Sequence, residues 1–175
     1  MHTIERLSAE EFDASVKDLA ALLVDAVDSG ASVGFLAPFG HEEAAAWWRA
    51  QAPSVAEGGL LVWISREDGV VTGTISLALA RKPNARHRAE IAKLMVHRDA
   101  RGRGLSRALL AAAERAALDA GADLLLLDTE TGSLAENVYL TGGWTRYGIV
   151  PEYAGSPDGT LQDCSFFYKR LTVSA

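Results

Sequence analysis

The amino-acid sequence predicts a mixed α/β protein in which helices pack against one central mixed sheet. Apolar residues recur at helical spacing over residues 8–30 and 105–121. Two β-rich runs, residues 60–66 and 70–80, are joined by an Asp-Gly turn, which is typical of an antiparallel hairpin. The four leucines at 124–127 have the continuously apolar pattern of a strand inside a sheet that is covered on both faces.

The first predicted element is a helix that begins after Ser8. Ser8 and Glu11 have the spacing of a capping box, in which each residue satisfies a free amide of the other. Gly30 ends the run, whose apolar members share one helical face: Phe12, Val16, Leu19, Leu23 and Val27. A Gly/Pro-rich loop follows, and then a second short helix over 41–52 that stops before Pro53.

The later elements follow the same reasoning. Residues 89–96 are predicted to form a third strand, and the helix after it is closed by Gly121. After the leucine strand we expect a short helix over 133–141. A strand, a loop and a last strand come next, over residues 144–150, 151–162 and 164–171. The predicted order of elements is α-α-β-β-β-α-β-α-β-β.

The composition excludes several classes of protein. The 175 residues favour a single domain over 1–175, and the 49% hydrophobic content is that of an ordinary globular protein. The net charge of −6 argues against nonspecific nucleic-acid binding. Cys164 is the single cysteine, so an internal disulfide and a multi-cysteine zinc site are excluded. We expect no metal, because three histidines lack ligand spacing: His41, His87 and His97.

The sequence also carries no sign of a membrane segment. No apolar stretch approaches the roughly 20 residues that a spanning helix needs. Residues 1–12 lack the basic-then-apolar pattern of a signal peptide. A single cysteine is typical of a reducing compartment. We therefore expect a cytoplasmic protein without a membrane partner.

Residues 97–110, HRDARGRGLSRALL, concentrate positive charge and bare backbone between a strand and a helix. The stretch holds four arginines: Arg98, Arg101, Arg103 and Arg107. The first amides of a helix have no internal partner and carry partial positive charge, so an anion is stabilised there. Gly102 and Gly104 lack Cβ atoms, which lets a phosphate approach the backbone. The pattern therefore predicts a site for a phosphate-bearing ligand.

Other interpretations of this stretch remain. The glycines also suit a purely structural bend, with the arginines serving solubility. A P-loop is excluded because Gly-Lys-Ser/Thr is absent. A dinucleotide site is disfavoured, because Arg107 stands where a third small residue is expected and a hairpin precedes the motif strand. Asp128 nevertheless suits a ribose, so a nucleotide-dependent oxidoreductase stays open as the weaker interpretation.

Two segments resemble motifs of the GNAT superfamily, the GCN5-related N-acetyltransferases. RGRGLS, residues 101–106, is similar to Q/R-x-x-G-x-G/A, with Ser106 replacing the last Gly or Ala. LAENVYLTGGW resembles A-x-x-x-Y-x-x-x-G-[FW], with four residues in register: Ala135, Tyr139, Gly143 and Trp144. Gly132 stands where an asparagine is common in the family. The resemblance covers roughly residues 60–170 and implies the GNAT fold, a mostly antiparallel sheet with a splayed parallel pair of strands.

The resemblance implies acetyl-coenzyme A as the acetyl donor. Its pyrophosphate would rest on the motif segment, whose residues are Arg101, Gly102, Arg103, Gly104, Leu105, Ser106 and Arg107. Its pantetheine arm would meet the backbone of the preceding strand at Leu94, Met95 and Val96. By the same resemblance, residues 1–55 form a helical acceptor-side region and residues 60–171 form the cofactor-binding core.

Within the superfamily, residues 124–144 and 151–161 are most similar to bacterial small-molecule acetyltransferases of the tabtoxin-resistance type. This predicts transfer of an acetyl group to the primary amine of a small molecule, such as an amino acid, a polyamine or an antibiotic. A role in antibiotic resistance and a homodimer are both compatible with the resemblance. Two alternatives stay open: a non-catalytic acyl-CoA-binding module, and an acetyltransferase of protein N-termini or lysines.

Acetyl transfer to an amine requires a base. An alkyl amine with a pKa of about 10 is protonated at pH 7, so a neighbouring group must take its proton. Glu90, on the motif strand, and Asp128, at the end of the leucine strand, are the two candidates. As structural alternatives, Glu90 pairs with Lys93 or Arg88. Asp128 caps the helix that starts near Ser133, or it forms a hydrogen bond with Thr129 or Thr131.

Tyr139 is the predicted donor of a proton or hydrogen bond to the departing thiolate, with buried packing as its structural alternative. A backbone amide of Met95 or Val96 is expected to bind the developing oxyanion. Candidate acceptor contacts come from the early loop and helix and from the late loop: Phe35, Trp48, Tyr153 and Asp158. Trp47 and Trp48 cannot both face inward on one helix, so at least one is predicted to be partly exposed.

Overall fold

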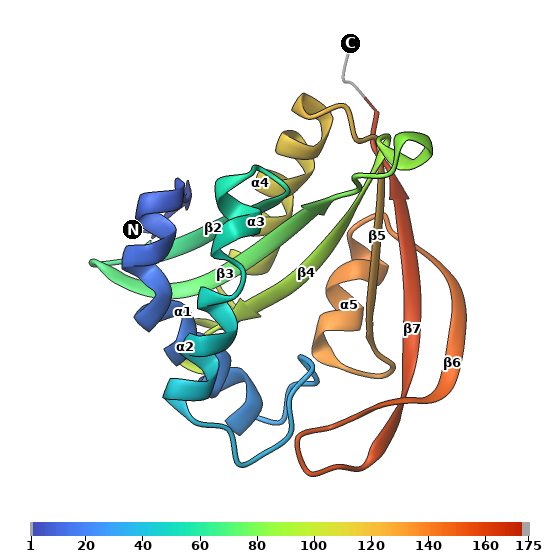
Figure 1. Cartoon of the computed structure of the whole chain (residues 1–175). Helices are drawn as coiled ribbons and strands as arrows, with labels where there is room; N and C mark the ends of the chain where they lie inside the picture. The colour runs from blue at the N-terminus through green and yellow to red at the C-terminus, as the bar shows by residue number, and fades with distance from the viewer. Residues whose placement is uncertain (1, 173–175) are drawn as a thin grey trace.

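A computed structural model, which describes residues 2–172, has one seven-stranded sheet with helices on both faces (Figure 1). The strands lie in the order β1-β2-β3-β4-β5-β7-β6. The pair β4–β5 is parallel and the other neighbouring pairs are antiparallel. The predicted mixed α/β fold is confirmed. The strands are β1 His2–Arg6, β2 Leu60–Glu67, β3 Val70–Leu79, β4 Arg88–Val96, β5 Leu124–Glu130, β6 Thr145–Gly155 and β7 Leu161–Arg170.

Five α-helices and two short 3-10 turns connect the strands. None of the helices in the described part of the chain is long and apolar enough to cross a membrane. The α-helices are α1 Ala9–Asp28, α2 His41–Arg49, α3 Ala52–Ala56, α4 Leu105–Asp119 and α5 Leu134–Thr141. The 3-10 turns are η1 Pro83–Ala85 and η2 Arg98–Ala100.

Helix α1 begins as the sequence predicts. The Ser8 hydroxyl accepts a hydrogen bond from the Glu11 amide at 3.2 Å, and the Glu11 carboxylate accepts one from the Ser8 amide at 2.8 Å. The capping box is therefore complete. At the other end, Gly30 takes a φ of +85°, which favours glycine and turns the chain out of the helix.

Three expectations about the elements are wrong. Strand β1 was not predicted, because its five residues include one strongly apolar side chain, Ile4, and so show no alternation. The expected second helix is two helices, since Pro53 lies within the first turn of α3. Strand β6 continues through residues 151–155, where a loop was expected. Pro151 is tolerated there because β6 is an edge strand.

Two cores lie on opposite faces of the sheet. Helices α1, α2 and α3 pack in front of the half formed by β2, β3 and β4, and α4 lies behind (Figure 1). On β5, Leu125 and Leu127 are buried in the core shared with α4 and α5, whereas Leu124 and Leu126 are half-buried. The expectation that both faces of β5 are covered is therefore wrong, because α1 covers β3 and β4 instead.

The sheet opens between β4 and β5. The two strands pair only from Arg88–Leu124 to Glu90–Leu126 and then diverge (Figure 1). On its other edge, β4 has a bulge: two residues, Lys93 and Leu94, face a single residue of β3. Lys93 has a φ of +51°, the left-handed conformation that non-glycine residues rarely adopt. Because a bulge bends its strand, β4 turns away from β5 and leaves a gap.

Candidate active site

The loop after β4 leaves the start of α4 uncapped. Gly102 and Gly104 have φ values of +77° and +79°, a backbone conformation that glycine adopts without strain. A Cβ at either position would meet no atom within 4 Å. Gly104 is the N-cap of α4, and among residues 2–172 no side chain accepts a hydrogen bond from the first amides of the helix. These donors are therefore available to an anion.

The arginines of the loop contact protein groups in this structure. The Arg98 amide and guanidinium both donate to the Asp25 carboxylate on α1. Arg101 donates to the Val96 carbonyl at 3.2 Å and to the Ser29 hydroxyl at 2.9 Å. These contacts fasten the loop to α1 and to the end of β4.

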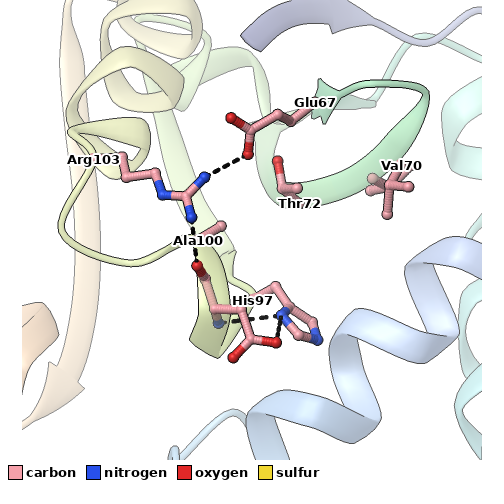
Figure 2. Close-up of a pocket in the computed structure, with 8 residues that line it drawn as sticks. Glu67, Val70, Thr72, His97, Ala100 and Arg103 are labelled. Carbon is pink, nitrogen blue, oxygen red and sulfur yellow. Dashed lines mark hydrogen bonds and ion pairs between the residues drawn. The ribbon is translucent and has the colours of Figure 1, made fainter. Parts of the chain in front are cut away.

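Arg103 fastens the loop to the hairpin on the other side. Its guanidinium forms a 2.6 Å ion pair with Glu67 and donates to the Asp99 carbonyl at 2.9 Å (Figure 2). A pocket of about 260 Å³ lies beside this ion pair, and its lining residues are Glu67, Val70, Val71, Thr72, His97, Asp99, Ala100 and Arg103. Arg103 is the one predicted site residue in that lining, so the pocket is separate from the residues expected to do chemistry. Arg107 makes one long contact, 3.4 Å to the Thr141 hydroxyl.

Glu90 and Asp128 lie where β4 and β5 separate. Glu90 faces Leu126 in the last pair of the two strands, and Asp128 follows two residues later on the same face of β5. Both side chains are exposed. Partial burial raises the pKa of the Glu90 carboxyl, the negative charge of Asp128 raises it further, and the Lys93 ammonium opposes them. The carboxylates are therefore electrostatically coupled at the mouth of the gap.

In the described part of the chain, Glu90 is not paired with Lys93 or Arg88, and Asp128 does not cap α5. Glu90 forms no ion pair within 4.0 Å there. Ser133 caps α5 itself, because its hydroxyl accepts from the Glu136 amide at 3.2 Å. Asp128 instead accepts a hydrogen bond from the Cys164 thiol on β7 at 3.4 Å. Burial, the Asp128 charge and this bond raise the pKa of the Cys164 thiol to about 12.

Tyr139 lies on α5, on the opposite face of the sheet from α1. Its ring packs against Trp144 and Phe167, at centroid distances of 5.8 and 5.9 Å. Burial raises the pKa of Tyr139, and the negative charge of Asp128 raises it further. The hydroxyl therefore stays protonated at neutral pH and is close enough to Asp128 for the two groups to interact.

Aromatic side chains form a wall beside the gap. Trp48 is fully buried, and its indole N–H donates to the Leu19 carbonyl, so it has no surface for a ligand. Its neighbour Trp47 is partly exposed, which confirms the prediction for adjacent tryptophans. The Trp47 ring packs against Phe35 at 5.6 Å. Lys93 Nζ lies 5.0 Å from the Trp47 centroid and 5.8 Å from that of Phe35.

The two late candidates lie on the β6–β7 hairpin. Tyr153 is on β6, 52% exposed, and packs edge-on against Phe166 at 5.1 Å. Asp158 is in the turn after β6, where its carboxylate accepts from the Thr160 amide at 2.9 Å. This turn meets the early loop, because the Ala37 amide donates to the Pro157 carbonyl at 2.7 Å. Both segments lie at the end of the molecule toward which the gap opens (Figure 1).

Sequence reasoning missed the positions of Lys93 and Cys164, whereas Trp47 is among the early aromatics that it associated with the acceptor wall. For Lys93 a signal was present, since a charged residue interrupts the otherwise apolar run IAKLMV. Such an interruption is typical of a bulge or a ligand-facing position. The contact between Cys164 and Asp128 depends on the register of β5 with β7, which no local pattern reveals.

The model of the acetyltransferase (GNAT) family matches residues 19–140. Solved structures agree in fold. The protein yncA from Salmonella typhimurium, whose structure was solved with its cofactor acetyl-CoA, is 24% identical and has a TM-score of 0.78 over 100% of this chain and 96% of that one. An N-acetyltransferase from Staphylococcus aureus Mu50 is 19% identical, with a TM-score of 0.80 over 98% and 99%. A ribosomal-protein-alanine N-acetyltransferase from Brucella melitensis is 23% identical, with a TM-score of 0.76 over 97% and 99%.

The Asp25 anchor of the loop predicts a stability effect. Burial opposes ionisation of the Asp25 carboxyl, but hydrogen bonds from Arg98 and the positive charges of His97 and Arg98 hold its pKa below the ordinary value of 3.8. Asp25→Asn is therefore expected to lower the free energy of unfolding by about 1–3 kcal/mol at pH 7. The pKa of Asp25 is lower in the folded state than in the unfolded state, so the ionised carboxylate stabilises the fold fully above pH 3.8. The stability lost in Asp25→Asn is therefore constant from pH 7 down to about pH 3.8 and becomes smaller only at lower pH, as the carboxyl takes up a proton.

Urea denaturation from pH 3 to pH 7 measures this effect. Asp28→Asn, at an exposed position at the end of the same helix, is the matched control and should leave stability unchanged. Equal losses in the two variants would contradict the anchoring role of Asp25.

Proposed function

The chain belongs to the GNAT family of acetyltransferases, and on this premise we propose that it transfers the acetyl group of acetyl-CoA to the primary amine of a small molecule. One observation carries the proposal: an uncapped helix start and two exposed, coupled carboxylates lie along a single opening of the sheet. Residues 124–144 and 151–161 further support a relation to small-molecule acetyltransferases of the tabtoxin-resistance type.

The residues after β4 fit a diphosphate. The amides from Gly102 to Arg107 lack side-chain caps, and the two glycines leave open space in front of the backbone. In this proposal Arg101 and Arg103 hold the loop in shape, while Arg107 is the arginine most available to phosphate, because its protein contact is the longest. Leu105 and Ser106 contribute their amides rather than their side chains.

The end of β4 fits an amide-containing chain. Met95 and Val96 pair with β3 on one edge, at Thr74 and Gly73, while the other edge has no β5 partner beyond Glu90. Backbone groups from Leu94 to Val96 on that open edge have no partner on β5, although the Val96 carbonyl accepts a hydrogen bond from Arg101. The pantetheine arm carries two amides and would satisfy them in the manner of an added strand. An amide of Met95 or Val96 is also the proposed donor to the oxyanion.

Acetyl-CoA supplies an activated acetyl thioester. Glu90 or Asp128 first takes a proton from the acceptor ammonium, directly or through one water, and this frees the nitrogen lone pair that forms the new N–C bond. The raised pKa of Glu90 makes it a stronger base than an ordinary glutamate. Tyr139 would donate its hydroxyl proton to the sulfur as the C–S bond breaks, and its raised pKa keeps that proton in place until then. The second proton that the nitrogen loses on becoming an amide would return to the tyrosine oxygen, so the hydroxyl is restored.

The proposed acceptor pocket combines the early and late segments. Phe35 and Trp47 form one wall, with Trp47 replacing the buried Trp48, while Tyr153 and Asp158 lie on the hairpin opposite. Residues 1–55 thus supply one wall of the acceptor side, the β6–β7 hairpin supplies the opposite wall, and the rest of residues 60–171 forms the cofactor-binding core.

Thiol release from acetyl-CoA tests the function directly. Small amines are expected to be acetylated, whereas peptides with free N-termini or lysines are not. Preference for peptides would favour a protein acetyltransferase, and silence with every acceptor, despite tight acetyl-CoA binding, would favour a non-catalytic binding module.

The uncapped helix start predicts a cofactor-specific variant. Gly104→Ala adds a Cβ where the diphosphate is proposed, so acetyl-CoA should bind about tenfold more weakly, a loss of about 1.4 kcal/mol. Gly121→Ala has the same left-handed strain, with a φ of +80° and open space. Both variants should lose about 1–2 kcal/mol of stability from that strain. Melting with increasing acetyl-CoA separates the effects, and equal affinities in the two variants would exclude this diphosphate site.

The carboxylates predict a pH dependence. Glu90 is active as a base only when ionised, so kcat/KM should rise with pH through its raised pKa. Glu90→Gln should remove this rise and lower kcat/KM by roughly 10²–10⁴-fold. Asp128→Asn removes a charge that raises the Glu90 pKa, so the rise should move to lower pH. Losses below about twofold in both variants would exclude the two residues as bases.

Tyr139→Phe isolates the hydroxyl. Phenylalanine keeps the packing against Trp144 and Phe167, so stability and acetyl-CoA binding should be retained, while kcat should fall by roughly 10²-fold. Tyr147→Phe, on the exposed side of β6, is the control and should retain full turnover. Unchanged kcat in Tyr139→Phe would remove its role as a proton donor.

A further inference from the structure

Lys93 is a half-buried cation that forms no ion pair with any acidic side chain of residues 2–172. Its ammonium lies over the Trp47 and Phe35 rings, at 5.0 and 5.8 Å from their centroids. Within residues 2–172 it has no ion pair within 4.0 Å and donates no hydrogen bond. Cation–π contacts compensate only part of the hydration that a lysine loses on burial. Three N–H donors therefore remain for a ligand.

The bulge of β4 places this side chain beside the aromatic wall. Lys93 is in the bulge of β4 with a φ of +51°, a conformation that costs about 1–3 kcal/mol and is typical of functional positions. The early loop lies next to the ammonium, because a Cβ at Gly34 would be 3.9 Å from Lys93 Nζ. The ammonium thus lies between the aromatic wall and that loop, on the acceptor side of the opening.

The ammonium of Lys93 and the carboxylates of Glu90 and Asp128 lie along the same opening and carry opposite charges. Burial lowers the pKa of Lys93, but the charges of Asp128 and Glu90 raise it and favour the ammonium form. Both carboxylates nevertheless lie beyond 4.0 Å, so they do not neutralise it by direct contact. A purely cationic acceptor would leave Lys93 unpaired and be repelled by it. A zwitterion would satisfy both ends.

We propose that Lys93 binds the carboxylate of the acceptor, which makes the acceptor an amino carboxylate whose amine faces Glu90 and Asp128. This inference rests on the proposed function and narrows its substrate class. The rings of Trp47 and Phe35 exclude water from one side of the ion pair, which strengthens it. Lys93 is therefore a specificity-determining residue, and polyamines are excluded as preferred acceptors.

Matched substrates test the proposal. Leucine, methionine, phenylalanine and glutamine are each compared with their carboxamides, which keep the amine and side chain and lose the negative charge. For at least one pair, kcat/KM is expected to favour the acid by about 10²-fold. Lys93→Met keeps the packing between the rings and should abolish that preference, by lowering kcat/KM for the acid and not for the amide. Lys93→Arg should retain it, and Lys82→Met, at an exposed position, should leave it unchanged.

The outcomes separate this proposal from the proposed function. Turnover of other amines without any preference for acids would overturn the carboxylate site and leave the acetyltransferase intact. If Lys93→Met lowers kcat/KM equally for the acid and the carboxamide and shifts the pH profile, Lys93 acts as a counterion of Glu90 and Asp128. That result also overturns the carboxylate site. If no amine is turned over, isothermal titration calorimetry measures whether the four amino acids bind to the CoA-saturated protein, and this tests the carboxylate site. Binding that Lys93→Met abolishes would uphold the site, and no binding would overturn it.

Discussion

The structure depends on one constraint: β4 and β5 pair over only three residues before they diverge. Parallel strands that continued to pair would satisfy their backbone groups and close the sheet. The bulge at Lys93 and Leu94 prevents this by turning the second half of β4 away. The same bend leaves an open backbone edge, places Glu90 and Asp128 at the vertex and directs Lys93 toward the acceptor side. A single irregularity in one strand therefore creates the opening and supplies part of its chemistry.

A second requirement is that the loop after β4 keeps its shape without capping its own helix. Arg98, Arg101 and Arg103 meet this requirement by bonding to α1, to the end of β4 and to the β2–β3 hairpin. None of these contacts uses the amides in front of α4, so those amides stay unblocked. The local concentration of arginine in an acidic chain thus has an architectural explanation beside its electrostatic one.

Local signals made much of the fold predictable from the sequence. The capping box at Ser8, the Asp-Gly hairpin and the glycine-rich start of α4 are determined by neighbouring residues, and all three are found. The features that the sequence did not predict depend on residues that are distant in the chain. Residues 2–6 form strand β1 because they pair with the edge of β2. Pro151 is tolerated in β6 because β6 lies at the opposite edge of the sheet. The partners of Arg98 and Arg103, at Asp25 and Glu67, are 73 and 36 residues away in the chain.

The account is tested most directly by a crystal structure of the protein with coenzyme A. It predicts diphosphate oxygens within hydrogen-bond distance of the amides between Gly102 and Arg107, and the pantetheine arm along the open edge of β4. A ligand in the pocket beside Glu67 and Arg103, or a β4–β5 gap filled by side chains, would contradict it.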